Sequence, residues 1–192
     1  MKANDTASQL MDAAQDLIQD RGYNAFSYKD LAETVGIRTA SIHYHFPSKG
    51  DLGVALMQRY LEDLDEALAK IDRNARSARA KLKALFRLYA ETEAGGAICL
   101  CGSLAADRQT LPEPLQDAVA AYLERSEAWV AEVLSEGKRE GEFRSSTKPD
   151  DTAVTLLASL QGGLILSRAR SEREPLLASV QRVLLKNLET PS

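Results

Sequence analysis

The sequence predicts an all-α protein of about nine helices. Apolar residues recur three and four positions apart in almost every segment, as they do on the buried face of an amphipathic helix. No run alternates apolar and polar residues as a half-buried strand would. Capping patterns and single glycines stand at the ends of the helical segments. Together these observations favour a helical bundle.

Composition narrows the class of protein. Of the 192 residues, 44% are hydrophobic and 27% are charged, which is ordinary for a globular protein with a core. No apolar run reaches the roughly 20 residues that cross a bilayer, and the N-terminus lacks the apolar stretch of a secretory signal. The two cysteines form no disulfide framework, so we expect a cytoplasmic protein. Because the net charge is −4, binding to a polyanion would depend on a local patch.

Turn and capping residues place the helix boundaries. The stretches Ser27–Asp30 and Ser48–Asp51 each match a capping box, in which two side chains satisfy the first free N–H groups of a helix. Gly36 ends a short helix because glycine readily adopts the left-handed conformation, and Pro47 closes the next one. The predicted helical segments are residues 7–23, 27–36, 38–46, 48–71, 78–93, 97–107, 111–143, 152–170 and 175–188.

Two short helices joined by a glycine-containing turn, residues 27–46, match the helix-turn-helix pattern. Serine and threonine on the outward side of the second helix can bond base edges, and an alanine methyl can contact thymine. Tyrosine, histidine and lysine suit phosphate oxygens. An αα-hairpin whose aromatic residues cap a small core is the alternative. The side chains expected to face inward are Leu31, Val35, Ile37, Ile42 and Phe46.

The charge of this region does not decide between the alternatives. The first 50 residues carry five basic and six acidic side chains. A single copy with so few cations would bind DNA weakly, because phosphate contacts supply most of the affinity. Binding to DNA would therefore require two copies of the chain.

The motifs are more specific than the pattern. After a helix that ends in "RGY", the phrases "F-S-x-x-D-L-A-E-x-V-G-I" and "S-I-H-Y-H-F-P-S-K-G-D-L" resemble the TetR family of transcriptional regulators over about the first 55 residues. The resemblance implies an N-terminal helix-turn-helix domain, residues 1–52, that binds double-stranded operator DNA. It also implies a larger helical domain, residues 53–192, that binds an inducer and forms a homodimer.

Carried over by position, the resemblance also implies which residues contact DNA. Thr39, Ala40 and Ser41 take base-reading positions. Two of the positions depart from the family pattern, since Ala40 stands where glycine is usual and His43 where tyrosine is usual. Both departures bear on the operator sequence and the affinity. Arg38, at the start of the helix, is also counted among the DNA-binding residues. The expected phosphate contacts are Ser27, His43, Tyr44, His45 and Lys49.

The phrase "GGAICLCGSLAAD" is the most distinctive of the larger domain. It resembles a "G-C-L-x-x-x-L-A-x-E"-like segment in a branch of the family that includes regulators of electrophile responses, with Cys99 on the position of that branch's cysteine. Cys99 and Cys101 can be small buried hydrophobes, which is the usual role of free cysteine. Cys99 can instead be a thiol sensor, which requires partial exposure and a lowered pKa. A metal site is the least favoured because Cys-x-Cys supplies two ligands at most, and we expect no cofactor.

Four aromatic residues of this domain recur at helical spacing and are therefore core candidates: Phe86, Tyr89, Tyr122 and Trp129. With Cys99, some of them can line an inducer cavity between helices. The chain offers no base beside a nucleophile outside the helix-turn-helix segment, which argues against an enzyme. A helical adaptor that does not bind DNA is a further alternative.

The last two helical segments predict a dimer interface. Residues 152–170 are apolar over more than one face, too much for a helix with one side in water. Residues 175–188 carry a second apolar stripe. We expect both segments to pair across a two-fold axis, with Leu160 and Leu184 at the interface. The predicted function is a homodimeric repressor that a small molecule releases from a palindromic operator, with thiol sensing through Cys99 as the alternative trigger.

Overall fold

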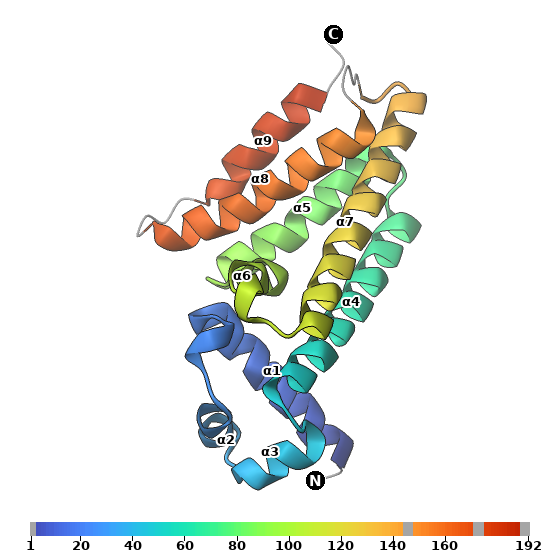
Figure 1. Ribbon diagram of the computed structural model, residues 1–192. Helices are drawn as coiled ribbons and strands as arrows, with labels where there is room; N and C mark the ends of the chain where they lie inside the picture. Colours follow the sequence, from blue (N-terminus) through green and yellow to red (C-terminus); the bar gives the residue numbers. More distant parts are fainter. Residues whose placement is uncertain (1–2, 144–147, 171–174, 189–192) are drawn as a thin grey trace. The chain divides into compact units, whose positions relative to one another are not determined.

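The computed structural model of the protein describes residues 3–143, 148–170 and 175–188. Across these residues the elements are nine α-helices and two short 3-10 helices (η), which confirms the predicted all-α fold (Figure 1). In chain order they are α1 (Ala3–Arg21), η1 (Tyr23–Ala25), α2 (Tyr28–Val35), α3 (Thr39–His45), α4 (Lys49–Asn74), α5 (Ala78–Ala94), α6 (Leu100–Ala106), η2 (Arg108–Thr110), α7 (Glu113–Arg139), α8 (Pro149–Ala169) and α9 (Leu176–Leu188).

Both predicted capping boxes are present. The backbone N–H of Ser27 donates to Oδ2 of Asp30 at 2.7 Å, and the N–H of Asp30 donates back to the Ser27 hydroxyl at 3.4 Å. The same reciprocal pair joins Ser48 and Asp51, at 2.9 and 3.1 Å. Gly36 ends α2 with a φ of 75°, in the left-handed region. Local sequence therefore sets both ends of α2 and the start of α4.

Contacts between residues divide the chain into two compact units. Unit 1 comprises Met1–Asp63 and Cys99–Tyr122, and unit 2 comprises Leu64–Ile98 and Leu123–Ser192. Unit 1 is thus assembled from two separate stretches of sequence, and α4 and α7 each contribute residues to both units. The domain boundary expected at residue 52 stays a prediction.

Unit 1 has a core built from α1, α2, α3 and α6. Of the side chains expected to face inward, Leu31, Ile42 and Phe46 are buried, while Val35 and Ile37 are half-buried. Helix α6 packs on α1, and the buried Ser103 hydroxyl donates to the carbonyl oxygen of Ile18 at 2.8 Å. These contacts hold the helix-turn-helix segment on a rigid base.

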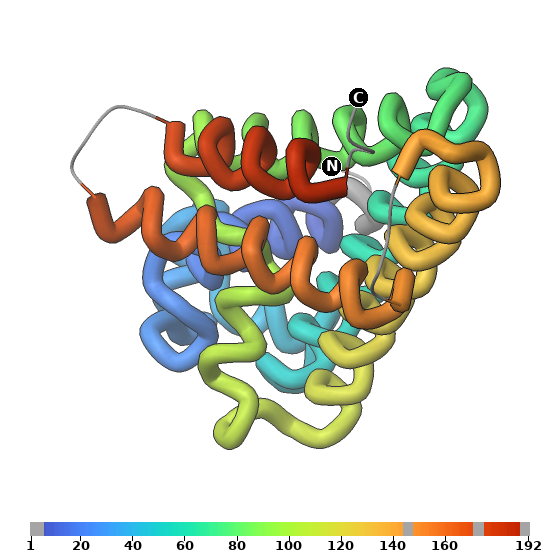
Figure 2. Tube along the Cα trace, turned by 90° about the horizontal axis from the view of Figure 1, so that it is seen from above, coloured from blue at the N-terminus to red at the C-terminus, as the bar shows by residue number. Residues whose placement is uncertain are grey.

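Unit 2 is a packed group in which α5, α8 and α9 contact one another (Figure 2). A Cβ atom at Gly163 of α8 would lie 2.5 Å from a methyl of Leu177, so glycine lets α9 approach closely there. The adjacent Gly162 has no neighbour within 4 Å on that basis. Gly163 therefore permits close helix packing within the protomer, and Gly162 does not take part in it.

Two glutamates cap helices that are distant from them in the sequence. Glu142 accepts the N–H groups of Ala78 and Arg79 at the start of α5, at 3.2 and 3.0 Å. Glu93 accepts the N–H of Leu177 near the start of α9, at 3.2 Å. A carboxylate at a helix N-terminus satisfies free donors and complements the helix dipole.

Helix α8 buries one apolar face within the protomer and exposes another. Leu160, which we expected at an interface between subunits, is fully buried inside the protomer and cannot lie on its surface. Three apolar side chains of the opposite face are about half exposed: Val154 at 49%, Ile165 at 50% and Leu166 at 55%. Val183 of α9 is 57% exposed. In the described part of the chain, no helix combines the length and apolar character needed to cross a membrane.

Candidate DNA-binding surface

A buried hydrogen bond fixes α2 against the end of α3. The Tyr28 hydroxyl donates to the carbonyl oxygen of Phe46 at 3.0 Å. Burial, with a smaller effect from the Asp51 carboxylate, raises the pKa of Tyr28 to about 12. The phenol is therefore neutral and remains a donor at any physiological pH. This contact orients the outward face of α3.

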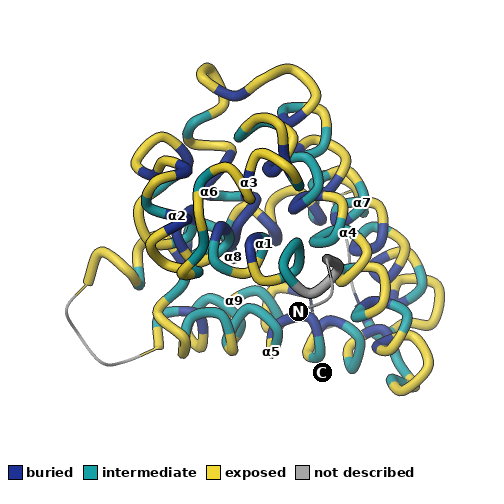
Figure 3. Tube along the Cα trace, turned by 90° about the horizontal axis from the view of Figure 1, so that it is seen from below, coloured by how far each residue is buried: buried dark blue, intermediate teal, exposed yellow. Residues whose placement is uncertain are grey.

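An open hollow of about 500 Å³ lies along that face. Its lining brings together five of the predicted DNA-binding residues: Arg38, Ala40, Ser41, Tyr44 and His45. Ile37 and Thr6 complete it. Figure 3 shows α2 and α3 with exposed stretches alternating with buried ones, as expected of helices that pack on one side only.

The side chains of the hollow match the chemistry of a DNA groove. Tyr44 is 81% exposed, so its ring and hydroxyl are accessible to a partner. Ser41 supplies a hydroxyl for base edges, and Ala40 a methyl for thymine. Arg38 supplies a guanidinium suited to a phosphate group through two parallel hydrogen bonds. Thr39, also assigned to base reading, is half-buried at the first turn of α3 and lies outside the lining.

Two predicted phosphate contacts already have partners inside the protein. The Ser27 hydroxyl donates to the Asp30 carboxylate at 2.6 Å. This hydrogen bond lowers the pKa of the Asp30 carboxyl group. The His43 ring pairs its Nδ1 with the carbonyl oxygen of Pro47 at 3.1 Å and packs edge-on to Tyr28. Because a carbonyl only accepts, Nδ1 of His43 is the donor in this contact.

The third, Lys49, is half-buried. Its ammonium nitrogen lies 2.5 Å from the carbonyl oxygens of both Tyr23 and Phe26. It also lies 4.5 Å from the centre of the Tyr23 ring and 4.0 Å from that of Phe26. Burial lowers the pKa of Lys49. The assignment of these three residues to phosphate contact stays a prediction.

The structure separates the predicted inducer-binding residues. Cys99 and Tyr122 belong to unit 1, where Tyr60 joins them: its ring stacks on Tyr122 with centres 5.0 Å apart, and its hydroxyl lies 3.7 Å from the Cys99 sulfur. Both cysteines are buried. Burial raises the pKa of the Cys101 thiol, which makes it a poor nucleophile.

The other three belong to unit 2. Phe86 and Trp129 are buried, and the Trp129 indole donates to Asp72 at 3.0 Å. Tyr89 is half-buried, 3.4 Å from the side-chain amide of Gln161. Packing therefore accounts for the burial of both Phe86 and Trp129.

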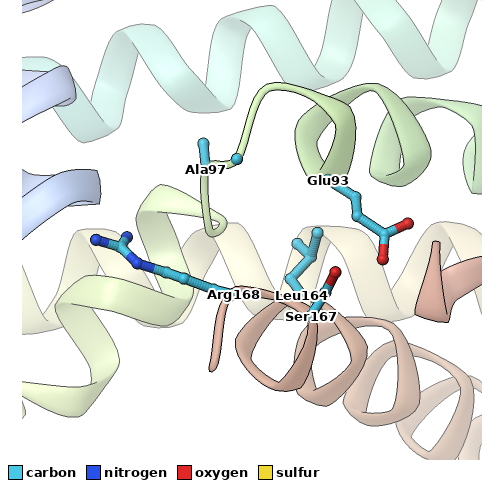
Figure 4. A pocket seen from close by; sticks show the side chains of 6 residues that line it. Glu93, Ala97, Leu164, Ser167 and Arg168 are labelled. Carbon is cyan, nitrogen blue, oxygen red and sulfur yellow. The ribbon is translucent and has the colours of Figure 1, made fainter. Parts of the chain in front are cut away.

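A small cavity in unit 2 is lined by other residues. Its volume is about 60 Å³, against the roughly 300–1,000 Å³ of ordinary ligand pockets. In Figure 4 the Glu93 carboxylate and the Arg168 guanidinium point to opposite sides of it. The remaining lining residues are Gly96, Ala97, Leu164 and Ser167. None of the predicted inducer-binding residues lines this cavity.

Sequence reasoning missed Thr6 and Tyr60. Thr6 comes from α1, more than 30 positions before the α3 residues with which it shares the hollow. No local pattern marks it, although a polar residue near the start of the first helix is an available signal. Tyr60 lies on α4, and no local pattern marks it as a neighbour of Cys99 and Tyr122.

Comparison with known proteins agrees with this architecture. The family described as "Bacterial regulatory proteins, tetR family" matches residues 10–56, and "Tetracyclin repressor-like, C-terminal domain" matches residues 78–183. The chain is 28% identical over 191 residues to the HTH-type transcriptional repressor DhaR of Mycobacterium sp. (strain GP1), which covers 95% of this chain and 94% of that protein. It is 28% identical over 144 residues to the repressor KstR2 of Rhodococcus jostii, covering 72% and 68%.

Solved structures give the same result. A regulator from Agrobacterium tumefaciens superposes with a TM-score of 0.94 at 28% identity, covering 98% of this chain and 100% of the other. One from Legionella pneumophila has a TM-score of 0.85 at 32% identity, covering 94% and 96%. Both carry titles that place them among the TetR regulators. The helix-turn-helix and the larger helical part are therefore found together in these proteins.

Proposed function

Because this chain belongs to the TetR family of DNA-binding transcriptional regulators, we propose that it is a repressor that binds a near-palindromic operator as a homodimer. Each subunit places α3 in the major groove of one half-site. A two-fold dimer makes the two half-sites inverted copies, about one helical turn of DNA apart or somewhat more. DhaR and KstR2, each 28% identical to this chain over the matched residues, are named as repressors.

The observation that carries this proposal is the composition of the hollow on α3. Five predicted DNA-binding residues line it together, and the most exposed large apolar side chain of the described chain, Tyr44, is one of them. Residues predicted to read bases and residues predicted to bind phosphate thus line one hollow. This arrangement suits a helix in a groove better than an αα-hairpin that only caps a core.

The test is a selection of bound duplexes from a random library, followed by binding assays on the recovered sequence. We expect an inverted repeat. Ser41→Ala should change the preferred bases, whereas Arg38→Met should weaken binding to all sequences and reduce its salt dependence. Recovery of no enriched duplex would refute the proposal and favour a helical adaptor. Recovery of asymmetric sites alone would refute the two-fold arrangement.

The exposed apolar face of α8 and α9 supports the homodimer. Val154, Ile165 and Leu166 of α8 and Val183 of α9 leave apolar surface uncovered in the protomer. Gly162 lies open on α8 between them in sequence, so nothing on its own side blocks the approach of a partner helix. Apolar side chains left exposed on two helices that pack together favour an interface at this face.

We assign the trigger to a small molecule that binds the larger domain and favours a state with low DNA affinity. A ligand shifts such an equilibrium only if it binds the two states with different affinities. The burial of Cys99 favours reversible ligand binding over thiol chemistry as this trigger. Operator release should therefore respond to inert apolar compounds and persist in Cys99→Ser. Release by electrophiles alone, abolished in Cys99→Ser, would contradict this assignment.

A further inference from the structure

We propose that Lys49 is a positioning residue for DNA binding: its ammonium group holds the segment between α1 and α2 in place and makes no contact with phosphate. This inference rests on the proposed function, in which α3 reads an operator. It gives a role to a cation that lies next to the DNA-binding surface and outside the lining of its hollow.

Most of the hydrogen-bonding capacity of the ammonium group is used within the protein. An ammonium has three N–H donors, and two of them have partners in the carbonyl oxygens of Tyr23 and Phe26. The faces of the same two residues' rings cover the charge, as in cation–π pairs. Turning Lys49 toward a phosphate would leave both carbonyls without this donor in a partly buried site, which is unfavourable. The geometry thus favours the position in which the Lys49 ammonium group binds these two carbonyl oxygens.

The same segment is held from a second side by the end of α6. The N–H of Tyr23 donates to the Asp107 carboxylate at 2.9 Å, and the Asn24 side chain donates to the Thr110 hydroxyl at 2.8 Å. Gly22 precedes them with a φ of 88°, and a Cβ atom there would lie 3.3 Å from the Asp107 carboxylate. The segment Gly22–Phe26 therefore lies between Lys49 at the start of α4 and Asp107 at the end of α6.

The position of this segment bears directly on α3. Phe26 is followed by the Ser27 cap of α2 and by Tyr28, whose hydroxyl binds the carbonyl of Phe46 just after α3. A shift of the segment would move α2, and through the Tyr28 hydrogen bond it would move α3. Lys49 and Asp107 carry opposite charges but act on the same segment, so both should affect operator affinity in the same direction.

Opposite charges make the inference testable. The plot of log K against log salt has a negative slope. Removal of a phosphate contact reduces the magnitude of this slope by about 0.9 for duplex DNA. Removal of a positioning cation lowers the affinity and leaves that slope unchanged. Replacing Asp107 removes a negative charge, which by charge alone would strengthen binding to DNA. A positioning role predicts that it weakens binding.

The experiment measures the affinity of the full-length protein for the duplex recovered by selection, across a salt series. We expect Lys49→Met to lower the affinity at least tenfold with the wild-type salt slope, and Asp107→Ala to lower it as well. The double variant should bind the duplex no more weakly than the weaker-binding of the two single variants, because both substitutions act through one segment. Lys49→Arg should not restore binding, since a planar guanidinium does not fit a site built around a compact ammonium. Arg38→Met is the control and should reduce the magnitude of the salt slope by about one.

Affinity is measured per folded molecule, well below each variant's unfolding midpoint, because a purely structural role would leave that affinity unchanged. Three results would each overturn the inference. They are a salt slope whose magnitude is smaller by about one in Lys49→Met, wild-type affinity in Lys49→Arg, and tighter binding by Asp107→Ala. Failure of the wild type to bind any duplex would instead overturn the proposed function on which it rests.

A second measurement needs no substitution. Lysines of the free wild-type protein are acetylated in a timed reaction and located by mass spectrometry, with Lys29, whose side chain is 82% exposed, as reference. We expect Lys49 to react at least fivefold more slowly than Lys29 and to gain no further protection from the duplex. Rapid reaction of Lys49 in the free protein with strong protection by DNA would overturn the inference.

Discussion

A single glutamate placed at two positions of α8 should separate folding from dimerisation. Leu160 is fully buried in the protomer, whereas Ile165, a little more than one turn further along, is 50% exposed. Leu160→Glu loses about 1.5–3 kcal/mol of apolar burial and places a carboxyl group in a packed interior at a further cost of about 1–3 kcal/mol. The sum of about 2.5–6 kcal/mol is a large part of the roughly 5–15 kcal/mol that stabilises a typical protein.

Ile165→Glu should leave the protomer folded, because substitutions at exposed positions usually change stability by about 0.5 kcal/mol or less. In the dimer it would introduce a charge into the apolar interface, so we expect folded monomers. Sedimentation velocity reports the oligomeric state, and urea denaturation followed by circular dichroism reports stability. Ser135→Glu, at an exposed position of α7, is the matched control and should remain dimeric. A dimer that survives Ile165→Glu, or a stable Leu160→Glu protein with the wild-type midpoint, would refute the reasoning.

Three further outcomes follow from local geometry. Gly163→Ala should lower the thermal midpoint because overpacking costs about 1–3 kcal/mol against a gain in helix propensity of about 1 kcal/mol. Gly162→Ala, made in a monomeric variant, should keep that gain because its Cβ atom meets no neighbour. Equal thermal midpoints of the two variants would contradict the faces assigned to these glycines. In native protein, Cys101 should react with a maleimide far more slowly than in urea, and slower than Cys99, since burial raises its pKa; mass spectrometry after timed labelling checks this. Tyr28→Phe should reduce the loss of stability between about pH 10 and pH 12, because the unfolded phenol ionises near pH 10 while the folded one keeps its proton up to about 12; parallel urea midpoints in both proteins would refute it.

The features that the sequence predicted correctly depend on neighbouring residues. The capping boxes at Ser27 and Ser48 and the turn at Gly36 each involve groups within four positions, so short patterns identify them. Periodicity likewise identified Leu31 and Ile42 as core residues of the helix-turn-helix. These signals were sufficient for the fold class and for the location of the candidate surface.

The features that were missed depend on tertiary packing. Thr6 reaches the hollow on α3 only because α1 packs in unit 1. A lysine at position 49 is equally compatible with a phosphate or with two carbonyl groups, and the choice depends on where the chain turns its carbonyls. Leu160 was placed on the wrong side because a helix that is apolar on more than one face gives periodicity no means of choosing the side that faces the core.

The discontinuous composition of unit 1 has a consequence for protein synthesis. A nascent chain exposed only to residue 52 lacks the Ser103 hydroxyl that binds α1 and the Asp107 carboxylate that binds Tyr23. The last residues of unit 1 follow about 70 positions later, at Tyr122. At translation rates of about 5–20 residues per second, that interval is roughly 4–14 s. During this interval the helix-turn-helix segment lacks part of the packing of unit 1. A chain that ends before Tyr122 therefore carries a helix-turn-helix segment in an incomplete unit 1.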